Sequence, residues 1–285
     1  MFPRLKTILC AMLALILLAG SIPPVSATST DTVEVFGLTV DVAAEALDLS
    51  GIKIENIAAV EEILPMLPQL KHVEMCGCGL SNEDMATLRD AHPEIKFVWE
   101  VQIGHKKVRT DIEYFMPVYL DIGSLSKQDL YNLRFCTDVI LIDCGHYPVY
   151  DLSFLHYMPN IEYLLLCEAG IKDVEIISTC KNLRFLELFL CPIRDISPLV
   201  NLTKLEDLNI CVVGCDYTPL LQMTWLDRLW MARSKPDYDM VYALKEALPN
   251  TTIQYKYGSS TDRGWRYAPN YYMGRDIVGG FYMTA

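Results

Sequence analysis

The sequence has little positive charge. Its 285 residues include 24 Lys and Arg against 36 Asp and Glu, which gives a formal net charge of −12. This excess of acid disfavours binding to nucleic acid or to an anionic membrane surface, because both need basic patches. The same excess keeps a protein soluble and attracts a basic partner at low salt.

Local motifs for catalysis or cofactor binding are also lacking. None of the five histidines belongs to a zinc-binding or triad-like motif, and there is no Gly-rich phosphate loop or dinucleotide fingerprint. The best catalytic candidate is His146 beside Asp143. Asp143 and Glu187 would lie roughly 10 Å apart on a parallel sheet, at the loose end of glycosidase spacing. We therefore predict no enzymatic activity, no cofactor and no metal site.

Long hydrophobic runs are limited to one near the N-terminus. Ile8 to Gly20 is a 13-residue apolar run after Arg4 and Lys6, and Val25-Ser26-Ala27 offers a cleavage site. The run falls short of the ~20 residues that span a bilayer, so it predicts a signal peptide over residues 1–27. Export and cleavage near Ala27 would leave 22 basic and 36 acidic residues, a net charge of −14.

What the sequence does contain is a repeat with apolar residues at positions one, four and six. Its units begin at spacings of 22, 22, 22 and 21 residues. The first residues are Val139, Ile161, Leu183, Leu205 and Leu226. A fixed period near 22 with this pattern is the leucine-rich-repeat signature, and such units must stack to bury their apolar faces. The sequence thus predicts an α/β solenoid, a curved horseshoe with a parallel sheet on its concave side and helices or 3₁₀ turns on its convex side.

The repeat frame divides the chain into six segments. Before the short repeats, the pattern predicts a lead or cap, longer helical repeats with Ser81 as a helix cap, and an irregular insertion with a half-repeat capped by Ser126. A polar turn near residues 104–111 suggests a hairpin. An aromatic, Gly-rich tail follows the repeats and is expected to dock as a cap. The predicted boundaries are 1–27, 28–43, 44–103, 104–136, 137–257 and 258–285.

Nine cysteines follow the expected signal segment. Most fall on buried or turn positions of the repeat, so structural free thiols are favoured over a disulfide framework. Cys167 and Cys211, two repeats apart, would be roughly 9–10 Å from each other, beyond disulfide reach. A metal site at Cys76, Cys78 and His72 is the alternative, but no second ligand pair has zinc-site spacing.

Aspartates recur on the convex side at the same period. Asp151, Asp173, Asp195 and Asp216 each precede a Ser, Glu or Thr by two residues. The column could be misread as a metal or acid–base array. A short oxygen-bearing side chain at a repeated turn position is more simply a cap for that turn.

The unit from Leu183 to Lys204, "LRFLELFLCPIRDISPLVNLTK", resembles the 22-residue repeat of internalin-type bacterial leucine-rich-repeat proteins. Beyond it, the chain resembles exported leucine-rich-repeat proteins of anaerobic Gram-positive bacteria, which carry a similar Gly-Trp-Arg and Tyr-Tyr-x-Met tail. The resemblance implies a horseshoe that binds other proteins at the cell surface. No sorting motif, C-terminal anchor or internalin-type helical cap is seen, so it does not extend to wall attachment or host invasion.

The candidate binding face is the outward side of the concave sheet. Positions three, five and seven of each unit point away from the core, because side chains alternate along a strand. Aromatic residues with acidic neighbours are typical of protein interaction sites. The predicted ligand-binding residues are Tyr163, Leu165, Phe185, Glu187, Phe189, Asp207, Asn209, Arg228 and Trp230.

Three functions remain open. The first is an exported binding module that recognises a protein or peptide ligand, basic ligands included, through this face. The alternatives are a self-associating component of the cell envelope and a hydrolase. The alternative to an exposed ligand-binding face is that the tail or residues 104–125 cover some of its aromatic side chains.

Overall fold

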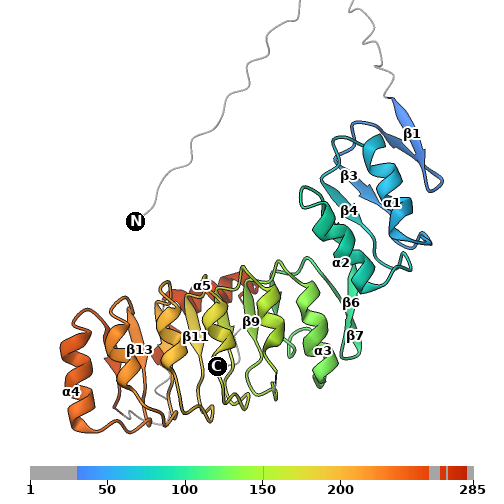
Figure 1. Ribbon diagram of the computed structural model, residues 1–285. Helices are drawn as coiled ribbons and strands as arrows, with labels where there is room; N and C mark the ends of the chain where they lie inside the picture. Colours follow the sequence, from blue (N-terminus) through green and yellow to red (C-terminus); the bar gives the residue numbers. More distant parts are fainter. Residues whose placement is uncertain (1–30, 150, 257–263, 268, 281–285) are drawn as a thin grey trace, which may run out of the picture.

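The structure is a computed structural model that describes residues 31–149, 151–256, 264–267 and 269–280. The expected signal segment lies outside these residues. Figure 1 shows two parts, an N-terminal unit around α1 and α2 and a longer row of stacked loops that runs from α3 to α4. In the described residues, no helix has the length and apolar character that crossing a membrane requires.

The stacked loops form a leucine-rich-repeat solenoid. Its spine is a seven-stranded parallel sheet in the order β14-β13-β12-β11-β10-β9-β8. Leu186 pairs with Leu164 on one side and with Leu208 on the other, and all three are fully buried. The predicted stacking of repeats is therefore confirmed, with the strand of each repeat forming one rung of the sheet in register with the next. The strands are β8 (Tyr114–Phe115), β9 (Leu141–Asp143), β10 (Tyr163–Leu165), β11 (Phe185–Glu187), β12 (Asp207–Asn209), β13 (Arg228–Trp230) and β14 (Thr252–Gln254).

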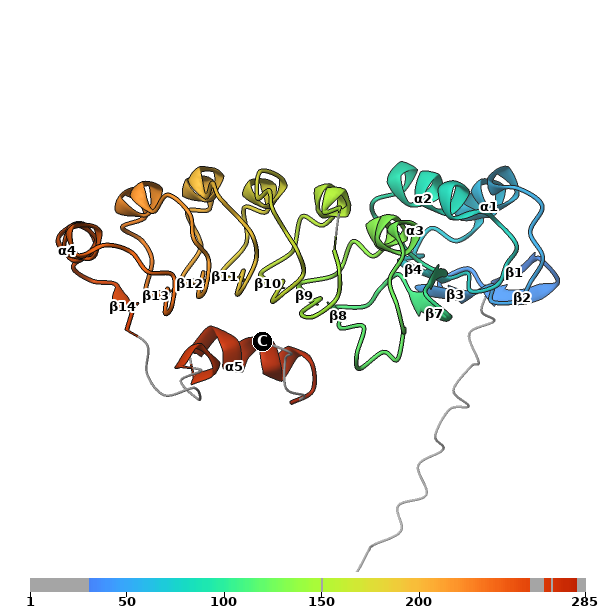
Figure 2. The same cartoon turned by 90° about the horizontal axis from the view of Figure 1, so that it is seen from below.

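The convex side of the four short repeats consists of 3₁₀ helices, visible opposite the strands in Figure 2. Each begins just after an aspartate of the repeated column, whose Oδ1 accepts a hydrogen bond from the backbone N–H two residues later at 2.8–2.9 Å. The capping role predicted for the column is confirmed. The helices are η3 (Ser153–Tyr157), η4 (Ile176–Thr179), η5 (Ser197–Asn201) and η6 (Thr218–Gln222).

Longer units flank the short ones and have α-helices on the convex side. In two of them a helix is followed by a proline, Pro93 or Pro249, and then by a strand. Ser81 caps α2 by accepting from the backbone N of Asp84, and Asp237 caps α4 in the same way through Met240. The helices are α1 (Ile57–Ile63), which runs into η1 (Leu64–Met66), α2 (Asn82–Ala91), α3 (Lys127–Asn132), which runs into η2 (Leu133–Phe135), and α4 (Tyr238–Ala247).

The sheet is not continuous along the chain. The N-terminal unit has its own three-stranded parallel sheet, and two antiparallel hairpins complete the fold before the spine begins. The second hairpin includes the predicted polar turn at Gly104 and His105. The parallel strands are β3 (Ala46–Asp48), β4 (His72–Glu74) and β5 (Lys96–Val98), and the hairpins are β1 (Thr32–Val35) with β2 (Leu38–Asp41) and β6 (Glu100–Ile103) with β7 (Lys106–Arg109).

One expectation about the frame is wrong. The part of the segment 104–136 that precedes the half-repeat is predicted to be an irregular insertion, but β8 lies within it and pairs with β9 as a regular rung. Phe115 is fully buried and pairs with Ile142, 27 residues later, so β8 and α3 together make one long repeat. The strand has only two residues and Pro117 follows closely. That is too short to show the alternation by which strands are recognised.

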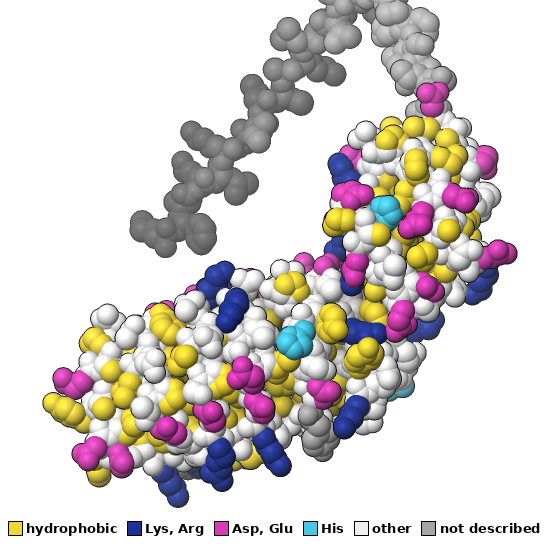
Figure 3. Space-filling model, in the orientation of Figure 1, with side chains coloured by type: hydrophobic (Ala, Val, Ile, Leu, Met, Phe, Trp, Pro, Cys, Tyr) yellow, Lys and Arg dark blue, Asp and Glu magenta, His cyan; other side chains and the backbone are white. Residues whose placement is uncertain are grey.

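Charge is not gathered into one dominant patch on the face shown in Figure 3. Acidic side chains are spread over both parts of the molecule, and basic side chains lie beside them along the lower edge of the solenoid. The last described segment, η7 (Gly264–Tyr267) and α5 (Pro269–Ile277), lies across the strand side of the solenoid, as Figure 2 shows.

Candidate functional site

The nine predicted ligand-binding residues come together on the concave side. Eight lie on β10 to β13 at the third and fifth positions of their units, and Phe189 follows β11. Register pairing sets the strand residues side by side on four adjacent rungs. Tyr163 thus lies next to Phe185, and Glu187 next to Asn209. The repeat frame therefore identified one contiguous face.

This face is not open to solvent as the alternation of strand side chains suggested. Phe189 and Arg228 are half-buried, and the other seven residues are buried, with Glu187 and Asp207 at 0% exposure. The cause is the C-terminal segment, which packs against the sheet and forms with it a second hydrophobic cluster, separate from the main core of the repeats. The alternative in which the tail covers the face therefore describes this structure.

Aromatic rings hold the tail to the face. The ring of Tyr271 lies 6.2 Å from that of Phe185, and the ring of Trp265 lies 5.9 Å from that of Phe189, both in tilted geometry. Tilted and edge-on pairs of this kind contribute about 0.5–1.5 kcal/mol beyond their area burial. Tyr271 is 1% exposed, and burial raises the pKa of its hydroxyl to about 12.

One polar contact fixes the position of the tail along the sheet. The Nδ2 of Asn270 donates to Oδ2 of Asp207 at 2.6 Å and to Oε2 of Glu206 at 2.7 Å. Arg228 also donates to Asp207, through Nε at 2.5 Å and through a terminal nitrogen at 2.9 Å. Burial raises the pKa of Asp207 despite the hydrogen bonds from Arg228 and Asn270. Asp207 is thus enclosed by donors from the sheet and from the tail.

Buried polar side chains continue along the same face. Asn209 donates to Oε1 of Glu187 at 3.2 Å across the rungs and accepts from the backbone N of Cys211 at 3.0 Å. Buried carboxylates and amides are tolerated when hydrogen-bonded, and they restrict which ligand groups match the surface. The face therefore combines apolar surfaces that contact aromatic rings with carboxylates that accept hydrogen bonds.

The tail residues that complete the site were missed as binding-face residues. Trp265, Asn270 and Tyr271 leave the repeat period, and the aromatic composition of the tail predicted a cap for an exposed end of the solenoid, with coverage of the concave face as the alternative. The structure corrects the location, because these residues cover the concave sheet. Met116, which follows β8, joins the same cluster.

The catalytic candidates are not brought together as a dyad. His146 is exposed and its Nδ1 lies 3.4 Å from Oε2 of Glu168. Asp143 is 1% exposed and accepts from the backbone N of Gly145 at 3.0 Å. The cysteine alternative also fails to converge, because His72 hydrogen-bonds to Glu74 at 2.9 Å and Cys78 is buried in the core.

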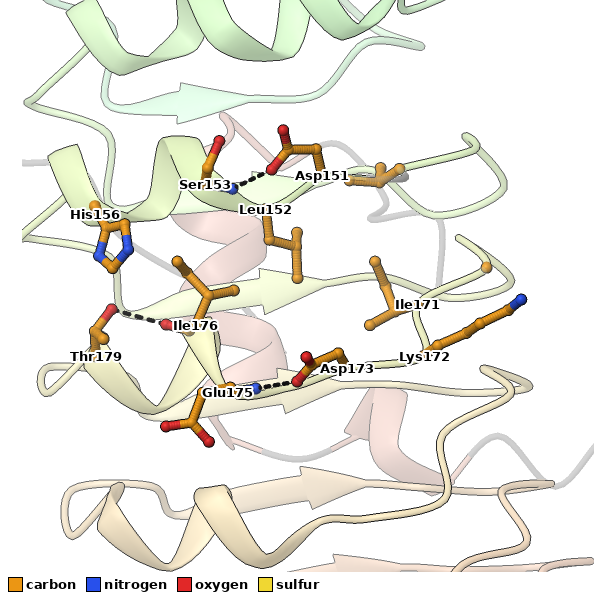
Figure 4. Close-up of a pocket in the computed structure, with 12 residues that line it drawn as sticks. Asp151, Leu152, Ser153, His156, Ile171, Lys172, Asp173, Glu175, Ile176 and Thr179 are labelled. Carbon is orange, nitrogen blue, oxygen red and sulfur yellow. Dashed lines mark hydrogen bonds between the residues drawn. The ribbon is translucent and has the colours of Figure 1, made fainter.

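A hollow of about 650 Å³ lies on the convex side between η3 and η4 (Figure 4). Asp151 and Asp173 border it, and each accepts from the backbone N–H that starts the next helical turn. Its floor is apolar, with Leu152 and Ile171 pointing into it. Because its carboxylates hold the repeat turns, we assign the hollow no binding role.

Comparison with known proteins gives likeness to solved structures alone. No family model matches the chain, and no curated protein matches it. It is similar to internalin C2 of Listeria monocytogenes (20% identity over 78% of this chain and 79% of that one, TM-score 0.39). A second internalin of that species is also similar (23% identity over 76% of this chain and 63% of that one, TM-score 0.39). So is a leucine-rich-repeat protein of Leptospira interrogans (17% identity over 74% of this chain and 54% of that one, TM-score 0.43). The chain spans less than two thirds of the length of each of these two proteins. The assignment of the fold rests on the register of the rungs.

Proposed function

We propose that this protein is an exported leucine-rich-repeat binding module whose concave face takes a helical protein segment bearing aromatic side chains. The observation that carries the proposal is that the chain's own residues 264–267 and 269–280 occupy the face in this manner. Two rings and one amide of the tail match two rings and one acidic pair of the sheet. The tail thus occupies the position that we propose for the partner.

The chemistry of the face defines the partner. Phe185 and Phe189 offer ring contacts, while Asp207 and Glu206 accept hydrogen bonds from whatever lies over them. A partner helix therefore needs one or two aromatic residues and an adjacent donor. A basic side chain would serve as well as the amide of Asn270, since charge-assisted hydrogen bonds to carboxylates are the stronger kind.

Binding requires the tail to leave the face. A segment in the same chain competes at an effective concentration on the order of millimolar, so a weak partner would not displace it. Substitutions that weaken the contacts of the tail should expose the face without altering the sheet. Binding to the face can then be measured without competition from the tail.

The test uses the full-length protein and a synthetic peptide with the sequence of residues 264–280. We expect the Trp265→Ala, Tyr271→Ala double variant to bind this peptide at least ten times more tightly than the wild-type protein, because the tail no longer competes. Adding Phe185→Ala should weaken the binding about tenfold or more through loss of the ring contact. Isothermal titration calorimetry measures both effects.

Leu190→Ala is the matched control, because Leu190 is an exposed apolar residue of the same repeat as Phe185. It should leave peptide affinity unchanged. Failure of the double variant to bind the peptide, or equal effects of the Phe185 and Leu190 substitutions, would contradict a peptide-accepting concave face.

A further inference from the structure

Three potential metal ligands converge at the edge of the sheet, next to the face that the tail covers with its rings. A ring nitrogen of His146, Sγ of Cys167 and a carboxylate oxygen of Glu168 all lie within 4.8 Å of one another. They come from the turns that follow β9 and β10, on two adjacent rungs. His146 and Glu168 occupy the eighth position of their units, and Cys167 the seventh.

The backbone holds these two turns in a fixed relation. The N–H of His146 donates to the carbonyl of Cys167 at 2.6 Å, and the N–H of Glu168 donates to the carbonyl of Phe189 on the next rung at 2.9 Å. His146 and Glu168 both have positive φ, 64° and 54°. The same conformation recurs at Leu190, Val212 and Arg233, so it belongs to the repeat and is not a feature of the cluster.

What is particular to the first two rungs is the set of side chains. The seventh and eighth positions of the later units are Phe189-Leu190, Cys211-Val212 and Ala232-Arg233, none of which supplies a thiol and a second ligand. The thiol of Cys167 is buried, whereas His146 and Glu168 are exposed. Of the described rungs, only this pair therefore places three donors of different kinds together.

We propose that His146, Cys167 and Glu168 bind a divalent transition-metal ion of the zinc class. Imidazole nitrogen, thiolate sulfur and carboxylate oxygen are the ligand atoms that zinc takes, and three protein ligands leave a fourth position for water. This departs from the absence of a metal site expected from the sequence.

The geometry needs only a small contraction. In a tetrahedral zinc site the ligand atoms are about 3.3–3.5 Å apart, given bond lengths of about 2.0 Å to nitrogen and oxygen and about 2.3 Å to sulfur. His146 Nδ1 and Glu168 Oε2 already lie 3.4 Å apart. Both side chains are about half exposed, at 53% and 44%, so they are free to rotate towards the sulfur.

The electrostatic surroundings favour a cation. The carboxylates of Glu187, Glu168 and Asp143 all lie close enough to the Cys167 sulfur to interact with it electrostatically. The competing interpretation is an ordinary surface contact between His146 and Glu168 above a buried thiol.

Cobalt(II) titration of the full-length protein distinguishes the two. Co²⁺ replaces Zn²⁺ in such sites and gives visible ligand-field bands and a thiolate charge-transfer band. We expect one equivalent of Co²⁺ to produce these bands and Zn²⁺ to remove them. His146→Ala, Glu168→Gln and Cys167→Ser should each weaken binding by more than about tenfold.

Two variants serve as controls. Cys211→Ser changes the equivalent buried thiol two rungs away, and His156→Ala changes an exposed histidine of the same unit as His146. Both should leave the spectrum unchanged. The His146 and Glu168 variants alter exposed residues, so circular dichroism should match the wild type even if Cys167→Ser misfolds. Absence of the charge-transfer band in the wild type, its persistence in His146→Ala, or its loss in Cys211→Ser would overturn the site.

Discussion

At the scale of single residues, one hydrogen bond repeated four times shapes the convex side. Each aspartate of the column accepts from the backbone N–H two residues later, which closes a tight turn before the 3₁₀ helix. These bonds favour the ionised carboxylate. Hydrogen bonds from Ser153, Ser197 and Thr218 lower the pKa of Asp151, Asp195 and Asp216 below the ordinary value of 3.8.

This column predicts part of the protein's acid sensitivity. A carboxyl group whose pKa is lower in the folded state stabilises the fold above its unfolded pKa, and that contribution is lost as pH falls. We expect the urea midpoint of the wild type to decrease as pH falls below about 4. The triple substitution of Asp151, Asp195 and Asp216 by Asn should lose less, because the amide oxygen still accepts the bond but does not titrate.

The matching triple substitution by Ala is the control, and it should lower the midpoint at neutral pH as well, since the acceptor itself is gone. An identical pH dependence in the wild type and the Asn variant would show that the column does not contribute to acid unfolding.

The sequence predicted the aspartate column because its members recur at the repeat period and each is followed two residues later by the residue whose backbone N–H it accepts from. The buried contacts of Asp207 were not predictable in this way. Arg228 lies one rung away and falls within the frame, but Asn270 comes from a segment 63 residues further on with no repeat of its own. A carboxylate at a solvent-facing position gives no sign that another segment will enclose it.

At the scale of elements, a single carboxylate joins the β6–β7 hairpin to α3. Oδ1 of Asp129 accepts from the backbone N of Gly104 at 2.7 Å, and Oδ2 accepts from the backbone N of Ser126 at 2.7 Å. Ser126 in turn caps the helix at the backbone N of Asp129, so the two form a capping box. Gly104 has a φ of +55°, and a Cβ there would lie 2.4 Å from the carbonyl oxygen of Ile122.

Asp129→Ala should therefore destabilise the protein more than Ser126→Ala. Loss of the serine cap alone is expected to cost about 1 kcal/mol, and loss of the aspartate about 2–3 kcal/mol, because two bonds to the helix start and one to the hairpin turn disappear together. Urea unfolding measures both free energies.

Asp138→Ala is a suitable comparison, since Asp138 makes an exposed ion pair with Lys96 and should contribute less than about 1 kcal/mol. If Asp129→Ala were no worse than Asp138→Ala, the hairpin would not depend on this link.

The sequence predicted elements where a local signal marks an end. Ser81 and Ser126 precede helices at the expected distance from their partners, and Pro93 and Pro249 separate helices from strands. It did not predict β8, because Tyr114 and Phe115 join the sheet through pairing with β9 and not through any pattern of their own.

At the scale of the whole molecule, the fold has a repetitive part and a part that depends on it. The spine follows from the 22-residue period, because identical spacing places Leu164, Leu186 and Leu208 on adjacent rungs. The tail has no such period. The partners Phe185 and Tyr271 are 86 residues apart, and the nine-residue α5 gains its burial from a sheet that must already exist. Its composition predicted docking, and only the folded sheet determines where it docks.

This order of dependence predicts that the tail can be released while the solenoid stays folded. Trp265→Ala with Tyr271→Ala removes both rings that contact the sheet, and truncation of a buried aromatic costs about 3–5 kcal/mol. We expect amide exchange in residues 270–278 to accelerate strongly, a hydrophobic dye to bind the uncovered face, and the unfolding midpoint of the solenoid to change little.

Tyr272→Ala with Met273→Ala is the matched control in the same helix, because these side chains are 37% and 44% exposed. It should preserve slow exchange and leave dye binding low. Light scattering separates the remaining possibilities. Concentration-dependent aggregation of the Trp265, Tyr271 variant identifies the tail as an intramolecular cover. A wild-type protein that is already a dimer and becomes a monomer on the same substitution would mean instead that copies exchange their tails, as the self-associating alternative requires.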